Sequence, residues 1–130
     1  MKILIKQAKI LDSSSKHNNQ RMDLLVEDGH ISTIAPQITA EVDHTIESED
    51  LCVSLGWVDL KSNFCDPGFE HKETIESGLD AAAMGGYTHV ALLPSTQPVI
   101  DGKSQIEYVK RRAENHVTRL YPMGTISAGM

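Results

Sequence analysis

The stretch that decides the fold is Gly56-Trp57-Val58-Asp59-Leu60-Lys61-Ser62-Asn63-Phe64-Cys65-Asp66-Pro67-Gly68. It overlaps a mostly apolar run, Ser54 to Leu60, which is typical of a strand buried on both faces. The pattern of the chain changes here, because shorter strands and turns precede this run and helix and strand periods alternate after it. We therefore expect two domains, residues 1–53 and residues 54–130.

The residues after this stretch predict a helix and then a second strand. Lys72 to Met84 has helical spacing, and Gly85-Gly86 supplies the stop. Tyr87 to Leu93 follows as a strand with an apolar run, and Pro94 ends it. The helix face expected to be buried carries Ile75, Leu79, Ala82 and Ala83.

A second helix and a third strand continue this alternation. Ser104-Gln105-Ile106-Glu107 has the spacing of a capping box, so we expect a helix from there to about His116. Leu120 to Ile126 would form the third strand. The order β-α-β-α-β implies a parallel sheet with right-handed crossovers, either an open doubly wound sheet or the first part of a barrel. The buried face of this helix would carry Ile106, Val109 and Ala113.

Residues 1–53 predict a small β-rich domain without catalytic groups. Apolar runs at residues 22–27 and 30–34 flank Asp28-Gly29, and an Asp-Gly pair in this setting is a strong hairpin signal. Residues 12–20 form a polar loop, and Thr45 to Val53 could add another strand. We expect this region to be a partial β-sandwich.

Composition narrows the possible functions. The chain has 130 residues and a net charge of −6, and its densest basic cluster is Lys110-Arg111-Arg112, so we expect no nucleic-acid partner. No apolar run is long enough to span a bilayer, and the first residues lack a signal-peptide pattern, so we expect a cytoplasmic protein with no membrane partner.

A complete (β/α)8 barrel needs about 250 residues, so a barrel would be represented only by its opening units, in a chain that looks truncated.

The motifs of residues 54–130, in their order and spacing, resemble the dihydroorotases of the amidohydrolase superfamily. In that family the first stretch reads Gly-Phe-Ile-Asp-x-His-x-His-x-Arg-x-Pro-Gly. The similarity continues through residues 66–78, 81–88 and 93–101, and through Pro122 to Ser127. The resemblance implies a TIM-type (β/α)8 amidohydrolase barrel preceded by a small β-domain, with zinc at the carboxyl ends of the strands.

The same resemblance implies a reaction and a ligand set. Family members interconvert dihydroorotate and carbamoyl aspartate in pyrimidine biosynthesis. Two histidines on one strand, two residues apart, point the same way and can hold zinc, which activates water and polarises the ring carbonyl. An arginine and an asparagine then bind the substrate carboxylate.

This chain departs from the family at each of those positions. Lys61 and Asn63 stand at the two histidine positions; an ammonium repels a cation, and an amide oxygen is a poor zinc ligand. Cys65 replaces the arginine and Ser95 the asparagine, so the carboxylate clamp is altered. What the chain retains is scaffold, including Asp59, Asp66, Pro67 and Gly68. We therefore expect no catalytic residue within this segment, and weak or absent zinc.

Two of the replaced residues have alternative roles. Lys61 could hold an anionic ligand without zinc, or its head could reach solvent or pair with Asp59 or Asp66. Cys65 could be a thiolate ligand or nucleophile, or part of a rebuilt zinc site with Asp66 and His71, but a small buried hydrophobic role is the more common one.

Three functions remain open from the sequence. The first is a dihydroorotase-like protein with impaired or absent zinc catalysis, acting as a structural or regulatory partner, in a homo-oligomer or a complex with other pyrimidine-pathway enzymes. The second is a working cyclic amidohydrolase whose metal ligands lie beyond residue 130. The third is a metal-free anion binder that uses Lys61.

Overall fold

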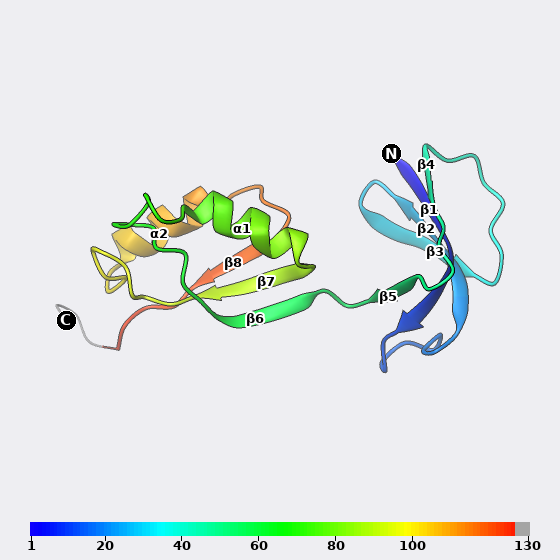
Figure 1. The fold of residues 1–130 in the computed structure, drawn as a ribbon, viewed down its shortest axis with the longest axis horizontal. Helices are drawn as coiled ribbons and strands as arrows, with labels where there is room; N and C mark the ends of the chain where they lie inside the picture. The colour runs from blue at the N-terminus through cyan, green and yellow to red at the C-terminus, as the bar shows by residue number, and fades with distance from the viewer. Residues whose placement is uncertain (127–130) are drawn as a thin grey trace. The chain divides into compact units, whose positions relative to one another are not determined.

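The computed structural model describes residues 1–126, so Ser127, the last residue of the family-like ending, lies outside the described part. The chain divides into two compact units, Met1–Leu55 and Gly56–Met130 (Figure 1). The first unit is built of strands alone, and the second combines strands with helices. Each unit has its own core and is described separately.

The first unit is a five-stranded sheet organised around one long strand, β1 (Lys2–Leu11). On one side β1 pairs antiparallel with β2 (Arg21–Glu27), which pairs with β3 (His30–Ala35). On its other side β1 pairs in parallel with two short strands in turn, β4 (His44–Ile46) and β5 (Cys52–Ser54). The buried side chains of this sheet are Leu4, Ala8, Ile10, Met22, Asp23 and Leu24.

The hairpin predicted at Asp28-Gly29 is confirmed. Glu27 pairs with His30 across the turn, and both turn residues have positive φ, 49° at Asp28 and 81° at Gly29. Two positive φ angles in a two-residue loop match the right-handed twist of the flanking strands. Local sequence alone was sufficient here, because the turn geometry depends on two adjacent residues.

One buried carboxylate organises the irregular part of the first sheet. The register of β1 shifts between Ile5 and Ala8, and Gln7 at the shift has φ 48°. The Gln7 backbone N–H and Nε2 donate to Oδ1 of Asp23 at 2.9 and 3.0 Å, and the Ile38 N–H donates to Oδ2 at 2.9 Å. Burial by itself would raise the pKa of Asp23, but these hydrogen bonds outweigh it, so the pKa lies below its usual value.

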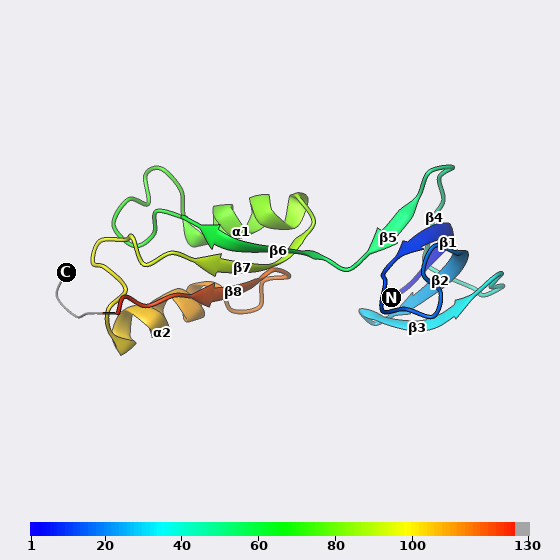
Figure 2. The ribbon, with the colours of Figure 1, turned by 90° about the horizontal axis from the view of Figure 1, so that it is seen from below.

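The second unit contains a three-stranded parallel sheet in the order β6-β7-β8. Its strands are β6 (Trp57–Ser62), β7 (Tyr87–Leu92) and β8 (Arg119–Pro122), joined through α1 (Ile75–Met84) and α2 (Lys103–Arg112). Both helices lie on the same face of the sheet (Figures 1 and 2). The predicted β-α-β-α-β order and parallel sheet are therefore confirmed.

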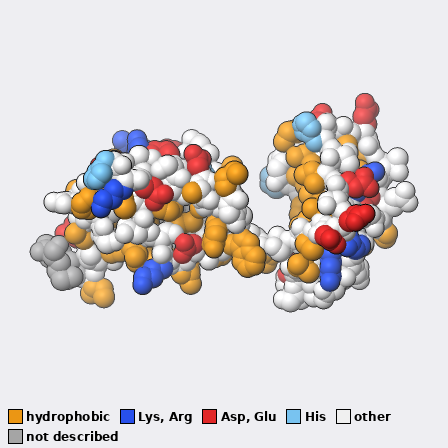
Figure 3. Space-filling model, in the orientation of Figure 1, with side chains coloured by type: hydrophobic (Ala, Val, Ile, Leu, Met, Phe, Trp, Pro, Cys, Tyr) orange, Lys and Arg blue, Asp and Glu red, His pale blue; other side chains and the backbone are white. Residues whose placement is uncertain are grey.

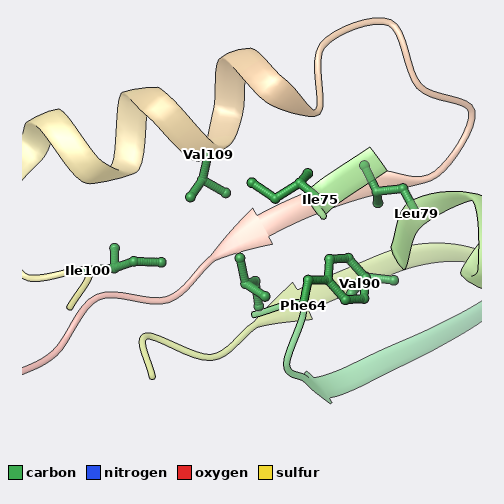
Figure 4. Close-up of a cluster of buried hydrophobic side chains, with 7 residues drawn as sticks. Phe64, Ile75, Leu79, Val90, Ile100 and Val109 are labelled. Atoms are coloured by element: carbon green, nitrogen blue, oxygen red, sulfur yellow. The ribbon is translucent and has the colours of Figure 1, made fainter. Parts of the chain in front are cut away.

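The core of this unit lies between the helices and the sheet (Figure 4). Six of the seven predicted helix-face residues are confirmed: Ile75, Leu79 and Val109 are fully buried, with Ala82, Ile106 and Ala113 packed against the core. Ala83, the seventh, is half-buried and does not belong to the cluster. Period-3.6 apolar spacing identified these positions because each helix has a single face toward the sheet. The buried cluster consists of Phe64, Ile75, Leu79, Val90, Leu92, Ile100 and Val109.

The helix starts differ from those predicted. The capping box expected at Ser104 and Glu107 is wrong: α2 begins at Lys103 after Gly102, which has extended backbone angles and makes no side-chain cap. Ser104 lies inside the helix, where its Oγ donates to Oε1 of Gln105. A capping box instead opens α1, where Thr74 accepts from the Ser77 N–H and the Ser77 Oγ accepts from the Thr74 N–H. Serine can take the reciprocal role usually given to Glu or Gln.

The strand of Ser54 to Leu60 is not buried on both faces as predicted. Trp57, Val58 and Leu60 expose 63%, 57% and 73% of their surface. Hydrophobic side chains accordingly appear on the surface of this unit where β6 begins (Figure 3). The reason is that residues 1–126 provide helices for one face of this sheet and no layer for the other.

Candidate functional site

The candidate site lies at the carboxyl end of β6, where burial alternates residue by residue. Ser62, Phe64 and Asp66 are buried, whereas Lys61 and Asn63 are exposed. Side chains two apart in an extended chain share a face, so Lys61 and Asn63 lie on the face of the sheet away from the helices. The structure thus places on one face the two residues predicted to stand at the histidine positions.

Lys61 forms an ordered backbone contact but no ion pair. Its N–H donates to Oδ1 of Asp59 at 2.8 Å, and the Ser62 Oγ donates to Oδ2 of the same carboxylate at 2.5 Å. These hydrogen bonds, that of Ser62 first, hold the pKa of Asp59 below its usual value. Within residues 1–126 the Lys61 ammonium pairs with neither Asp59 nor Asp66, so its head is left facing solvent.

Asn63 meets Ser95 at the ends of two neighbouring strands. The Ser95 Oγ lies 3.5 Å from Oδ1 of Asn63, at the outer limit of a hydrogen bond. The pairing of β6 with β7 explains this proximity, since the Leu93 N–H continues the ladder by donating to the Ser62 carbonyl at 2.8 Å. Both side chains are exposed and polar, and neither carries charge.

Cys65 is a partly exposed thiol in a left-handed backbone conformation, with φ 60°. A non-glycine residue with positive φ is uncommon and marks a sharp change in chain direction. The turn directs the chain from the end of β6 into the loop that leads to α1. The small buried hydrophobic role expected for Cys65 is therefore only partly met.

Asp66 is fully buried, and its carboxylate joins the loop to both helices. Oδ2 accepts the N–H of Ile75 at 3.1 Å, and Oδ1 accepts the hydroxyl of Tyr108 at 2.9 Å. Nη2 of Arg112 lies 3.9 Å from Oδ2 and also pairs with Glu76 at 2.7 Å. Burial and then the contact with Asp66 raise the pKa of the Tyr108 phenol. Asp66 is therefore a structural carboxylate.

Pro67 and Gly68 bring this loop against the loop that follows β7. The Pro67 carbonyl accepts the N–H of Gln97 at 2.9 Å. Gly68 has φ 105°, and a Cβ there would collide with the backbone carbonyl of Gln97. Only glycine satisfies both the backbone angle and the close approach. The retained Pro67-Gly68 pair therefore holds the two site-bearing loops together.

The donor set at the carboxyl end of β6 does not fit zinc. Lys61 offers an ammonium without a lone pair, and Asn63 offers a neutral amide oxygen. The alternative set of Cys65, Asp66 and His71 is not assembled either, because the Asp66 carboxylate is committed to Ile75 and Tyr108. Among residues 1–126 no three His, Cys, Asp or Glu side chains are grouped to hold a metal ion.

The open face of the sheet carries a shallow apolar hollow of about 380 Å³. The rings of His89 and Tyr121 stack there, with centroids 5.9 Å apart and planes inclined by 17°. Leu60, next to Lys61 in the chain, also borders the hollow, because the register of β6 against β7 shifts between Asp59 and Ser62. The lining residues are Val58, Leu60, His89, Val90, Ala91 and Tyr121.

The structure also reveals contacts around the candidate site that the sequence did not indicate. Tyr108 and Arg112 lie about one helical turn apart on α2 and reach back to Asp66, 42 and 46 residues earlier. No local pattern marks a contact over that separation.

A hollow of about 450 Å³ in the first unit is lined partly by Asp23, whose carboxylate already accepts hydrogen bonds from Gln7 and Ile38. We therefore place no reactive site there.

No helix within residues 1–126 is long and apolar enough to cross a membrane.

Comparison with known proteins adds a family to this geometry. A family model described as Dihydro-orotase-like matches residues 51–129. The Dihydroorotase of Acetivibrio thermocellus is 41% identical over 128 residues, which cover 98% of this chain and 30% of the relative. The Dihydroorotase of Syntrophus aciditrophicus is 38% identical over 130 residues, again covering 98% of this chain and 30% of the relative. The chain thus spans about 30% of the length of these relatives.

Solved structures share the fold at lower sequence identity. The L-hydantoinase (dihydropyrimidinase) of Arthrobacter aurescens aligns over 98% of this chain and 28% of its own, with TM-score 0.81 and 22% identity. A dihydroorotase aligns over 95% of this chain and 31% of its own, with TM-score 0.67 and 18% identity. The mixed α/β fold therefore resembles the N-terminal part of amidohydrolase chains. With more than half of its residues matched by the family model, the chain belongs to the dihydroorotase-like amidohydrolases.

Proposed function

We propose that this chain provides the small β-domain and the opening β/α units of a dihydroorotase-type (β/α)8 barrel, with a role in pyrimidine biosynthesis. The unit Met1–Leu55 corresponds in this proposal to the β-domain, and the parallel sheet β6-β7-β8 to the first barrel strands. Relatives named Dihydroorotase support it, as does the order of strands and helices. The family substrate, dihydroorotate or carbamoyl aspartate, is carried over as part of the proposal.

We further propose that zinc-dependent hydrolysis is impaired or absent. The observation that carries this is the alternating burial after residue 60, which leaves Lys61 and Asn63 on the open face at the carboxyl end of β6. These are the positions where the family places its paired imidazoles, and neither side chain offers a nitrogen lone pair for zinc at neutral pH. Cys65 and Ser95 stand at the proposed carboxylate-binding positions. The segment therefore lacks both the metal ligands and the carboxylate-binding groups of the family reaction.

A role in assembly is the function that we propose for an inactive member. Trp57, Val58 and Leu60 are large, exposed residues of β6, and in the proposed barrel the later strands would cover them, so a partner would bind elsewhere on the fold. A structural or regulatory partner in a homo-oligomer, or in a complex with other pyrimidine-pathway enzymes, would use a fold whose chemistry has been lost.

The alternative is a working cyclic amidohydrolase that takes its metal ligands from residues beyond 130. Barrel enzymes collect catalytic residues from the ends of several strands, so a site does not depend on the first strand alone. Such an enzyme would need a different way to bind the substrate carboxylate, because Cys65 cannot form the bidentate contact of an arginine.

The deciding experiment is dihydroorotate hydrolysis by the longest natural form of this polypeptide, purified with added zinc. The metal content of the same sample is counted, and the assay is repeated with a chelator. We expect neither turnover nor stoichiometric zinc. Turnover that the chelator abolishes would establish the alternative and refute the inactive reading.

A further inference from the structure

We propose that His116 is a pH-sensitive switch that holds the turn between α2 and β8, residues 113–118, only while its imidazole is neutral. The side chain of His116 lies between this turn and α1, with 19% of its surface exposed. The turn is at the amino-terminal ends of the strands, away from the candidate site. The inference therefore goes beyond the proposed function and does not depend on catalysis or on a metal ion.

The hydrogen bonds of the imidazole fix its tautomer. The backbone N–H of Thr118 lies 3.0 Å from Nδ1 of His116. A backbone N–H can only donate, so Nδ1 is an acceptor without a hydrogen, and Nε2 carries the hydrogen of the neutral ring. Nε2 lies 3.1 Å from Oδ1 of Asp80 on α1 and donates to it. One neutral ring thus connects the turn to a helix that precedes it by more than one strand.

Thr118 makes the turn sensitive to the loss of that acceptor. The residue exposes 1% of its surface, and its hydroxyl donates to the carbonyl oxygen of Tyr87, at the start of β7, at 2.8 Å. A proton added to Nδ1 of His116 would set one N–H against another. The buried Thr118 N–H would then lack an acceptor, and a buried donor left unpaired carries its full desolvation cost.

The charges around His116 decide the net effect of protonation. The Asp80 carboxylate attracts a charged imidazole, but 76% of the Asp80 side chain is exposed, so water screens this attraction. Lys110 of α2 and Arg119 of β8 line the same hollow as His116, and their positive charges oppose protonation. Protonation within the ordinary titration range of histidine, between about pH 5 and 8, should therefore release Thr118 and the start of β8.

The test is hydrogen–deuterium exchange of the Thr118 amide in the longest natural form of this polypeptide, read at single-residue resolution by mass spectrometry. Exchange is measured at about pH 7.5 and about pH 5.5, on either side of the usual histidine pKa. Each rate is divided by the chemical exchange rate at the same pH. We expect the protection of Thr118 to fall at least about tenfold at the lower pH. Equal protection at the two pH values would overturn the proposal.

His30 provides an internal control in the first unit. Its Nδ1 lies 3.1 Å from the carbonyl oxygen of Asp28, which can only accept, so this nitrogen carries a hydrogen whether the ring is neutral or charged. Protonation adds a hydrogen at Nε2 and leaves the contact in place. Amide protection in the hairpin of β2 and β3 should therefore be the same at both pH values. A matching loss there would reveal general acid destabilisation and reject the switch.

Variants assign the pH dependence to His116. His116→Asn supplies an acceptor that does not titrate, because an Asn side-chain oxygen readily accepts the N–H two residues later. It should keep Thr118 protected near neutral pH and abolish the pH dependence, and a surviving dependence would refute the assignment. Asp80→Asn removes the carboxylate that favours the charged ring, so it should shift the transition to lower pH. An unshifted transition would contradict the contact with Asp80.

Nitrogen NMR of the isotope-labelled imidazole keeps the proposal testable if His116→Asn does not fold. We expect the ring of His116 near neutral pH to carry its hydrogen on Nε2. A hydrogen on Nδ1 would show that the ring does not accept from Thr118, and the switch would be rejected.

Discussion

The hydroxyl of Tyr108 on α2 donates a 2.9 Å hydrogen bond to Oδ1 of Asp66, a carboxylate with no exposed surface in the loop that follows β6. The other oxygen of Asp66 accepts the first N–H of α1 from Ile75. One side chain thus connects the site-bearing loop to both helices of the second unit. The position of the loop therefore depends on a contact made 42 residues later in the chain.

Removing the Tyr108 hydroxyl should destabilise the second unit. Tyr108→Phe leaves a buried carboxylate without one of its donors, which costs about 1–3 kcal/mol. Urea unfolding followed by the fluorescence of Trp57, the single tryptophan of the chain, measures the loss. Tyr87→Phe is the control, because no hydrogen bond of its hydroxyl occurs within residues 1–126. Equal stability of the two variants would contradict a structural role for this contact.

Asp66 and Tyr108 should also be energetically coupled. In a double-mutant cycle with Asp66→Asn and Tyr108→Phe, we expect the double variant to be less destabilised than the sum of the single ones, by about 0.5–3 kcal/mol. The reason is that each substitution removes the same hydrogen bond. Strict additivity of the unfolding free energies would show that the 2.9 Å contact contributes nothing of its own.

Gly68→Ala should damage the loop severely. The added Cβ would meet the carbonyl of Gln97, and φ at Gly68 is 105°, outside the range of L-residues, so we expect a loss above about 2 kcal/mol. Gly124→Ala is the matched control, since the nearest atom to its Cβ position, the Ile100 carbonyl oxygen, is 3.7 Å away. The thermal unfolding midpoints of the two variants are compared. Similar midpoints would show that the contact between the Gly68 loop and the Gln97 loop does not contribute to stability.

Asp23 should make the first unit sensitive to acid. The pKa of Asp23 in the folded protein lies below the usual value near 3.8. The ionised carboxylate therefore contributes fully to the free energy of unfolding above the unfolded pKa of about 3.9, and this contribution is lost as the pH falls through the folded pKa. Asp23→Asn should therefore cost about 1–3 kcal/mol at pH 7, and less as the pH falls below about 4. Unfolding followed by far-ultraviolet circular dichroism checks this. A difference in unfolding free energy between the unsubstituted protein and Asp23→Asn that does not change with pH would refute the linkage.

Placing paired imidazoles at positions 61 and 63 should create zinc affinity. In the doubly substituted Lys61→His, Asn63→His chain, two rings two residues apart would project from the open face of β6 and bind zinc from adjacent positions. Metal analysis after equilibrium dialysis should show affinity at least about tenfold above that of Lys61→His alone, because chelation requires both rings. An unaltered zinc content in the double variant would mean that these positions do not converge as the backbone indicates.

Local patterns identified much of the fold. The Asp28-Gly29 turn depends on two residues with positive φ, and the buried faces of α1 and α2 follow from period-3.6 spacing, so both were predictable from short windows. The start of α2 was not, because Gly102 rather than Ser104 ends the preceding extended segment. Several adjacent residues can be of a type that caps a helix, and tertiary packing decides at which of them the helix begins.

The sequence by itself determined that Lys61, Asn63 and Cys65 follow one another at alternate positions from the carboxyl end of β6, and the resemblance to the family predicts His, His and Arg there. Residue types are read directly from the sequence. An ammonium has no lone pair and repels a cation, and an amide oxygen is a poor zinc ligand, so the residue types alone argue against zinc binding there. Only the tertiary structure decided that Asp66 is committed to Tyr108 and Ile75 and that the Lys61 ammonium forms no ion pair with any residue from 1 to 126. Those facts depend on contacts across a parallel sheet and its two helices, and residues so far apart in the chain leave no local signal of their pairing.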